Sequence, residues 1–179
     1  TFFEVGENDP AKLDISIVGI YDFETNTLKA FQEHEFKDIW PYFEKADALI
    51  GYNSNHFDIP LLNKYYTGDL TKIKSIDLMK TIQESLGRRI KLQDVASATL
   101  GVSKSGKGLD AITWWKEGAI DKIIEYCLMD VAITRDLYEH MKTHKKVSIP
   151  DGLNVYQIDL DISNWENNED SKLTHAMPW

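Results

Sequence analysis

Two segments of the sequence place an aspartate where a protein can hold a divalent cation. In the first, residues 50–62, a short apolar run ends at Asn53. A helix is expected to open near Phe57, with Asp58 in its first turn. Ligands gather outside the carboxyl ends of strands in open α/β sheets, and Asp58 follows such an end. Taken alone, an aspartate in the first turn of a helix is also explained by the helix dipole.

The second segment, residues 125–139, has helical spacing. Tyr126 and Asp130 are four residues apart and therefore share one helix face. Apolar positions surround Asp130, and a carboxylate among apolar neighbours costs free energy unless it is paired or bound to a cation. Taken alone, the segment is better explained by an exposed aspartate on a partly solvated face, near Arg135 or Lys122.

Together and in this order, the two segments resemble the second and third motifs of the DEDD 3′–5′ exonucleases, in the subgroup with a tyrosine before the last aspartate. Asn53, Phe57 and Asp58 match the second motif. Tyr126 and Asp130 match the third. The wording is closest to the proofreading domains of family-B DNA polymerases and to small stand-alone relatives.

The resemblance covers roughly Leu13–Met141 and implies an RNase H-like fold, an α/β domain with a central mixed β-sheet flanked by α-helices. It also implies hydrolysis of phosphodiester bonds at the 3′ ends of single-stranded DNA or RNA. The expected cofactors are two ions of Mg²⁺ or Mn²⁺, held by four carboxylates, because hard oxygen ligands suit these ions.

The resemblance further implies a role for each matched residue. Asp58 and Asp130 are expected to be catalytic and to supply two of the four metal ligands. Tyr126 is expected to orient the attacking water, which the two metals activate while they neutralise charge on the leaving 3′ oxygen. Asn53 and Phe57 are expected to shape the pocket for the terminal nucleotide.

The family's first motif, Asp-x-Glu, has one match in the letters of the sequence, at Asp22 and Glu24. Only 34 positions separate Glu24 from Asp58, whereas two strands, a helix, a further strand and their connections need roughly 45. The short spacing and the turn residues at Glu24–Thr27 therefore predict that Asp22 and Glu24 lie at the mouth of a hairpin. The alternative, that Asp22 and Glu24 are themselves the first motif, stays open at this point. The true first strand is expected upstream of Thr1, with Thr1–Leu13 as the loop after it.

The elements that position these residues follow from hydrophobic periodicity and turn chemistry. Strands are expected at 13–21, 28–31, 48–53, 74–79 and 153–163, and helices at 36–46, 57–66, 80–87, 91–101, 109–118 and 119–144. This order predicts a mixed α/β domain over residues 1–163, followed by a polar tail at 164–179.

Composition limits the function classes. The chain has 179 residues, of which 42% are hydrophobic, and this is enough for one well-filled core. A net charge of −9 disfavours a non-specific DNA-coating protein. It is compatible with a nuclease, because acidic metal ligands add negative charge that bound cations offset. Contacts to nucleic acid would then come from small basic patches at Gly87–Lys91 and Lys104–Gly108, unless these are ordinary solvated loops.

Cysteine content and hydropathy bear on location. A single cysteine, Cys127, excludes an internal disulfide framework and fits a reducing compartment. No segment resembles a signal peptide, and no apolar run reaches the roughly 18 residues of a membrane span. A cytoplasmic protein without membrane contact is therefore expected.

Three hypotheses remain open at this stage. The first is a 3′–5′ exonuclease domain whose first-motif strand lies upstream. The second is a non-catalytic RNase H-like scaffold that binds nucleic acid or protein and lacks the first carboxylate pair. The third is a generic α/β domain in which both motifs are coincidental. Residues upstream of Thr1 distinguish the first two hypotheses.

Overall fold

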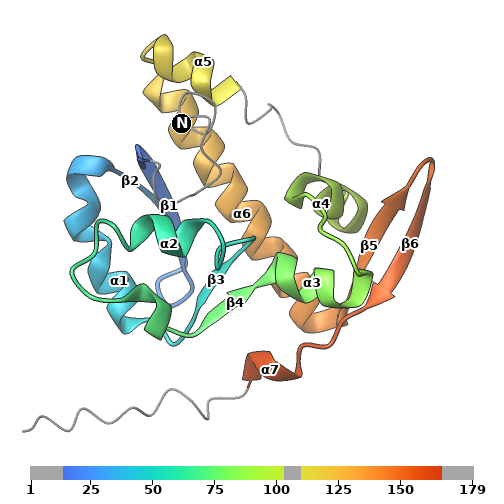
Figure 1. Ribbon diagram of the computed structural model, residues 1–179. Coiled ribbons are helices and arrows are strands. Elements are labelled where there is room, and N and C mark those ends of the chain that lie inside the picture. Colours follow the sequence, from blue (N-terminus) through green and yellow to red (C-terminus); the bar gives the residue numbers. More distant parts are fainter. Residues whose placement is uncertain (1–13, 103–109, 167–179) are drawn as a thin grey trace, which may run out of the picture.

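Figure 1 shows a computed structural model of the chain, which describes residues 14–102 and 110–166. Strands and helices alternate along much of it, which confirms the mixed α/β fold class expected from the sequence. The elements are β1 (Ile17–Asp22), β2 (Thr27–Gln32), η2 (Glu33–Asp38), α1 (Trp40–Lys45), β3 (Leu49–Gly51), α2 (Asp58–Leu62), η3 (Leu70–Lys72), β4 (Ser75–Asp77), α3 (Leu78–Leu86), α4 (Leu92–Leu100), α5 (Asp110–Lys116), α6 (Ile120–His144), β5 (Lys146–Asp151), β6 (Asn154–Asp159) and α7 (Ser163–Glu166).

The strands pair two by two. β1 and β2 form an antiparallel hairpin, β3 and β4 are parallel, and β5 and β6 form a second antiparallel hairpin. The sequence led us to expect one central sheet. Within the described ranges, however, no strand pairing joins β1–β2 to β3–β4. Each of β1 and β3 therefore keeps one edge without a paired strand in this part of the chain.

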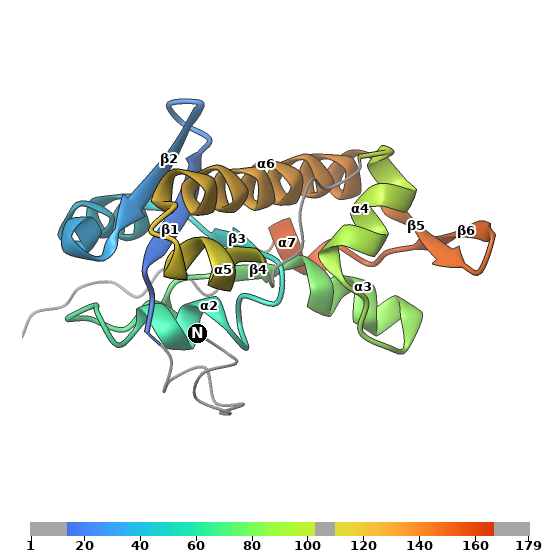
Figure 2. The ribbon, with the colours of Figure 1, turned by 90° about the horizontal axis from the view of Figure 1, so that it is seen from above.

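Helix α6 holds the two sheets together in place of strand pairing. It contacts β1, β2 and β3. Seen from above, α6 lies on one side of β3 and β4 while α2 lies on the other (Figure 2). In the parts of the chain that the structure describes, no helix is long and apolar enough to cross a membrane.

The approach of β1 to α6 depends on a glycine. A Cβ atom at Gly19 would lie 2.9 Å from Val131 Cγ2 and 3.0 Å from Cys127 Sγ. Contacts that short force neighbouring atoms to move, so any larger residue at Gly19 would push the strand from the helix. The lack of a side chain at Gly19 therefore lets β1 pack closely against α6, next to Cys127.

Two apolar clusters cover the two sides of the strands. One joins α3, α4, the second half of α6 and β5. Its most buried members are Leu78, Ile82, Val95, Leu137, Met141, Val147 and Ile149. The other joins η2, α1, α2 and η3 beneath the first hairpin and β3. Its buried members are Phe36, Ile39, Phe43, Ile59, Leu62 and Leu70. The clusters place α6 and α2 in separate layers with the strands between them.

Helix α2 is shorter than the sequence suggested. It ends at Leu62 rather than near Tyr66. Its C-terminal boundary is Asn63, whose side-chain oxygen accepts a hydrogen bond from Leu70 N at 2.8 Å. This bond holds the chain in a turn toward η3, and an asparagine that bonds to backbone in this way competes with helix continuation.

The β5–β6 hairpin was only half expected: a strand was predicted at 153–163 but none at Lys146–Asp151, although Val147 and Ile149 alternate there with less buried residues. The turn at Gly152 has φ +60° and follows Pro150 and Asp151, a turn composition that signals a hairpin in the sequence. Trp165, in the segment expected to be a polar tail, is buried and stacks on Tyr138 with ring centroids 5.4 Å apart. Residues 167–179, the rest of that segment, lie outside the described residues.

Candidate functional site

The loop between β3 and α2 carries the second-motif residues. Asn53 has φ +63°, a left-handed conformation that asparagine tolerates better than most residues. Its N–H donates to Asp77 Oδ1 at 2.8 Å, and the N–H of Asn55 donates to Asp77 Oδ2 at 3.1 Å. The loop is thereby tied to the end of β4.

Asp77 is the residue of this region that the sequence reasoning missed. Its side chain is buried and also caps α3, accepting from Met79 N at 3.1 Å and Lys80 N at 3.3 Å. One carboxylate therefore accepts bonds from four backbone N–H groups and links β3, β4 and α3. The available signal was its position directly before a helical pattern, where aspartate is a favoured cap.

Asp58 is the first residue of α2. The turn before it is closed by bonds from Phe57 N to Asn53 O at 3.0 Å and from Ile59 N to Ser54 O at 2.9 Å. Solvent reaches the Asp58 side chain, so it lies at the surface of the loop and not in the core. The surrounding protein still desolvates the carboxylate and raises its pKa to about 6, and the negative charge of Asp77 adds to the rise.

Cys127 connects Asp58 with the third-motif residues. Its thiol, packed against Gly19, has a pKa raised to about 11, first by burial and then by the charges of Asp130 and Asp58. The charges of both carboxylates thus raise the pKa of this one thiol, although the two aspartates come from distant segments. We call the part of the molecule around Asp58, Cys127 and Asp130 the carboxylate corner.

Tyr126 lies one helical turn before Asp130 on α6. Its ring meets the ring of Trp114, on α5, edge to face with centroids 5.9 Å apart. The tyrosine thus stands between the carboxylate corner and the α5 helix. Both Tyr126 and Asp130 are partly buried.

Asp22 and Glu24 serve the hairpin turn instead. Asp22 Oδ2 accepts from Thr25 Oγ1 at 2.7 Å, and Asp22 Oδ1 accepts from Glu24 N at 3.0 Å. The hydroxyl of Thr25, followed by the backbone N–H groups of Glu24 and Thr25, lowers the pKa of Asp22. Glu24 itself is exposed. The sequence predicted this position at the mouth of a hairpin, and the structure confirms it.

Contacts along α6 separate this turn from the carboxylate corner. The guanidinium carbon of Arg135 lies 4.8 Å from the ring centroid of Tyr21, and the rings of Phe23 and Tyr138 are 5.7 Å apart. Tyr138 is eight residues beyond Asp130, about 12 Å along a helix. The hairpin turn therefore lies beside the part of α6 around Tyr138, too far along the helix to share a site with Asp130.

The donor set of the carboxylate corner suits a hard cation only in part. Among residues 14–102 and 110–166, no group of three or more His, Cys, Asp or Glu side chains could hold a metal ion. Asp58 and Asp130 carry carboxylate oxygens, the kind of ligand that Mg²⁺ and Mn²⁺ prefer. The neighbouring charge that acts on Asp58 is negative, which favours a cation there. Two further ligands would complete the expected four.

One of the two candidate basic patches adjoins the loop that carries Asn53. Arg88 and Arg89 are exposed, and Arg89 Nη2 donates to Asn53 Oδ1 at 3.2 Å. A cationic side chain therefore lies beside the second-motif loop. The other patch, Lys104–Gly108, falls outside the described residues.

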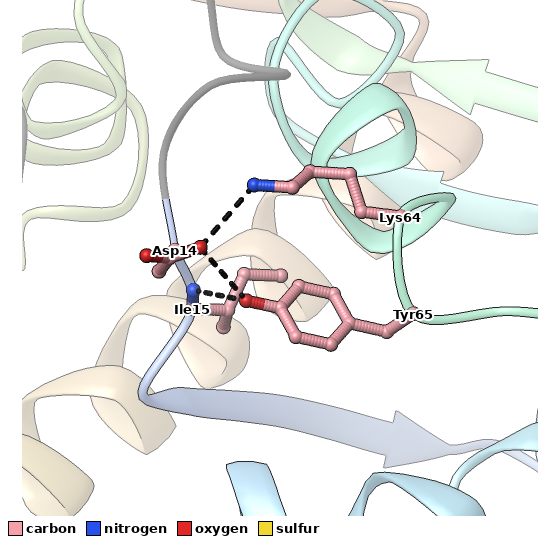
Figure 3. Close-up of polar contacts among 4 residues, drawn as sticks. All are labelled: Asp14, Ile15, Lys64 and Tyr65. Carbon is pink, nitrogen blue, oxygen red and sulfur yellow. Dashed lines mark hydrogen bonds and ion pairs between the residues drawn. The ribbon is translucent and has the colours of Figure 1, made fainter.

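A contact between the start of β1 and the end of α2 helps to hold this region together (Figure 3). Lys64 Nζ lies 3.3 Å from Asp14 Oδ1, and the Tyr65 hydroxyl accepts from Ile15 N at 3.1 Å. Asp14 is highly exposed, so its ion pair contributes little. The Ile15–Tyr65 bond is partly buried and is the stronger tie between β1 and the segment after α2.

Comparison with known proteins gives one family match. A family model of the RNase H superfamily matches residues 2–142, a region that contains both aspartate segments. The curated proteins and the solved structures yielded no match.

Proposed function

The chain belongs to the RNase H superfamily, whose members are commonly nucleases, and we propose that it is a metal-dependent 3′–5′ exonuclease domain acting on single-stranded nucleic acid. The observation that carries this proposal is the superfamily match over residues 2–142, a region in which Asn53, Asp58, Tyr126 and Asp130 follow the order of the second and third exonuclease motifs. The charges of Asp58, on α2, and Asp130, on α6, both raise the pKa of the Cys127 thiol, which supports placing the two carboxylates in one site.

Each residue has a role in this proposal. Asp58 and Asp130 would hold divalent ions, Mg²⁺ or Mn²⁺, which supply water activation and charge neutralisation at the leaving oxygen. The Tyr126 hydroxyl would orient the attacking water. Asn53, held by Asp77 and contacted by Arg89, and Phe57 would position the terminal nucleotide.

The remaining two carboxylates would come from an Asp-x-Glu pair on a strand that precedes Thr1 and lies between β1 and β3. Support for this place comes from the strand edges. Within the described residues β1 pairs only with β2 and β3 only with β4, while α6 contacts both β1 and β3. A strand inserted there would run beside Gly19, and therefore past Cys127.

A second candidate function is a non-catalytic scaffold that binds nucleic acid or protein. The observation that favours it is the count of ligands. The described residues hold no metal-binding group of three or more suitable side chains, and two carboxylates alone cannot neutralise two divalent ions.

The test uses the full-length protein, with any residues that precede Thr1, and 5′-labelled single-stranded DNA and RNA in Mn²⁺. The proposal expects products shortened stepwise from the 3′ end, and no cleavage of the same strand closed into a circle, which has no end. Cleavage of the circle would indicate an endonuclease. Binding of both strands without shortening would overturn the exonuclease proposal and favour the scaffold.

A further inference from the structure

A surface cavity of about 240 Å³ lies between α5 and α6. Its lining residues are Trp114, Lys122, Glu125, Tyr126 and Met129. We call this cavity the α5–α6 pocket. It shares Tyr126 with the candidate site, but none of its other lining residues belongs to the two matched motifs. Its volume is below the roughly 300–1,000 Å³ of sites for drug-sized ligands, so it suits a single ring system.

Two aromatic rings form adjacent walls of the pocket. The planes of Trp114 and Tyr126 meet at 63°. A flat ligand that stacks on one ring therefore meets the other at its edge, and both arrangements are favourable for aromatic pairs. Met129 adds a polarizable apolar surface that packs well against ring edges. These walls favour a planar aromatic ligand over a flexible chain.

The polar lining fits the edge of a heteroaromatic ring. Lys122 is a donor and carries positive charge, whereas Glu125 is an acceptor, and both are exposed at the pocket. A nucleobase offers ring acceptors and exocyclic amino donors on its edges, and the phosphates of the strand that carries it attract cations. A simple anion would not need the aromatic walls, and a lipid chain would not need the charged pair.

We propose that the α5–α6 pocket binds one unpaired nucleobase of the substrate strand, stacked on Trp114. This inference rests on the proposed function, since it takes the ligand to be the strand whose 3′ end lies at the carboxylate corner. Tyr126 and Asp130 are one helical turn apart, about 6 Å along α6. A base in the pocket would therefore lie close to the reacting end and fix the position of the strand.

The test measures binding without cleavage. Fluorescence anisotropy of 5′-labelled single-stranded DNA and RNA in EDTA gives the dissociation constant, because chelation removes divalent ions. Base stacking on one aromatic side chain predicts about 5- to 150-fold weaker binding for Trp114→Ala. Trp115→Ala is the matched control. Trp115 is on the same helix, is 48% exposed and does not line the pocket, so its loss should leave binding unchanged.

Strands with one abasic position, moved stepwise from the 3′ end, identify the bound base. At one position the missing base should weaken binding to the wild-type protein but not to Trp114→Ala, because the two changes remove the same contact. Trp114→Leu keeps an apolar side chain against α6 and is the second variant if Trp114→Ala lowers the melting temperature. A folded Trp114 variant that binds like the wild type, or an equal loss in Trp115→Ala, overturns the inference.

These outcomes separate the pocket from the proposed function. If Trp114→Ala binds the strand weakly and the wild-type protein does not shorten strands, the pocket proposal stands and the exonuclease proposal is overturned. If the wild-type protein shortens strands and the Trp114 variants bind as tightly as wild type, the exonuclease proposal stands and the pocket proposal is overturned.

Discussion

The hairpin turn at residues 22–27 and the carboxylate corner contain the same kinds of acidic residue in opposite electrostatic settings. In the turn, the Thr25 hydroxyl and backbone N–H groups lower the pKa of Asp22. In the corner, desolvation by the surrounding protein and the charge of Asp77 raise the pKa of Asp58 to about 6. Donors already satisfy the carboxylate of the turn, whereas desolvation and a neighbouring negative charge disfavour the ionised form of Asp58.

Spacing between carboxylates is therefore a weak guide to a metal site. Asp22 and Glu24 have the letters of a first motif, but the turn uses Asp22 to hold its own backbone. Asp58 and Asp130 lie far apart in the sequence and form no local motif, yet the charges of both raise the pKa of the Cys127 thiol. Whether a carboxylate is available depends on what its neighbours donate to it.

The largest expected effect is on nuclease activity, which should depend on the carboxylate corner and not on the hairpin turn. In the full-length protein, Asp58→Asn and Asp130→Asn should each lower the rate of strand shortening at least about 100-fold, because even partners of metal ligands are worth 10–100-fold. The double change Asp22→Asn and Glu24→Gln should stay within about twofold, as surface changes usually do. Loss of activity in the double variant would place the hairpin turn in the site.

The next effect concerns stability and compares two carboxylates that bind backbone N–H groups. Asp77→Ala orphans four N–H groups in a buried place and should lower the free energy of unfolding by about 2–4 kcal/mol. Asp22→Ala, in the exposed turn, should lower it much less. Urea denaturation measures both values, and equal losses would show that burial is not what distinguishes the two carboxylates.

A smaller effect is expected at Tyr126. Tyr126→Phe removes one hydroxyl and should slow strand shortening about tenfold, less than the 10²–10³-fold lost with a donor that acts directly on the reacting charge. The ring remains, so binding of the strand should not change. Tyr21→Phe is the control, since the Tyr21 hydroxyl bonds Asn26 within the hairpin turn. Unchanged turnover in Tyr126→Phe would contradict its assigned role.

The smallest expected effect is on the pH dependence of stability, which should have opposite signs for Asp58 and Asp22. The folded-state pKa of Asp58 lies above the 3.8 of a free aspartate, so wild-type stability falls as pH rises from about 4 through about 6. In EDTA, Asp58→Asn should therefore melt at a higher temperature than wild type above pH 6, and the advantage should vanish below pH 4.

Asp22 should behave in the opposite way. Its pKa is lowered in the folded state, so its contribution is present above pH 3.8 and is lost as pH falls through the folded-state value. Asp22→Asn should then melt at a slightly lower temperature than wild type at pH 7. Thermal melts of both variants between pH 3 and pH 8 check the signs, and the same sign for both would remove the electrostatic contrast between the regions.

The short-range features of the fold can be predicted from neighbouring residues. Turn residues after Asp22 predicted the first hairpin, and the periodicity of residues 119–144 predicted α6, found at Ile120–His144. Gly87 and Gly101, at φ +78° and +71°, end α3 and α4 as expected. These features depend on a few neighbouring residues, whose backbone preferences and hydrogen bonds act within one or two turns.

Contacts between distant segments depend on how whole elements pack. The influence of Asp58 on Cys127, the bonds from Asn53 and Asn55 to Asp77, and the stacking of Trp165 on Tyr138 all join residues that are far apart in the chain. The close packing of Gly19 against α6 is also a contact between distant segments. It leaves the Asp-x-Glu turn beside Tyr138 and away from Asp130. Local propensity contains no information on these contacts, because they arise from the packing of whole elements against α6 and from the desolvation that this packing brings.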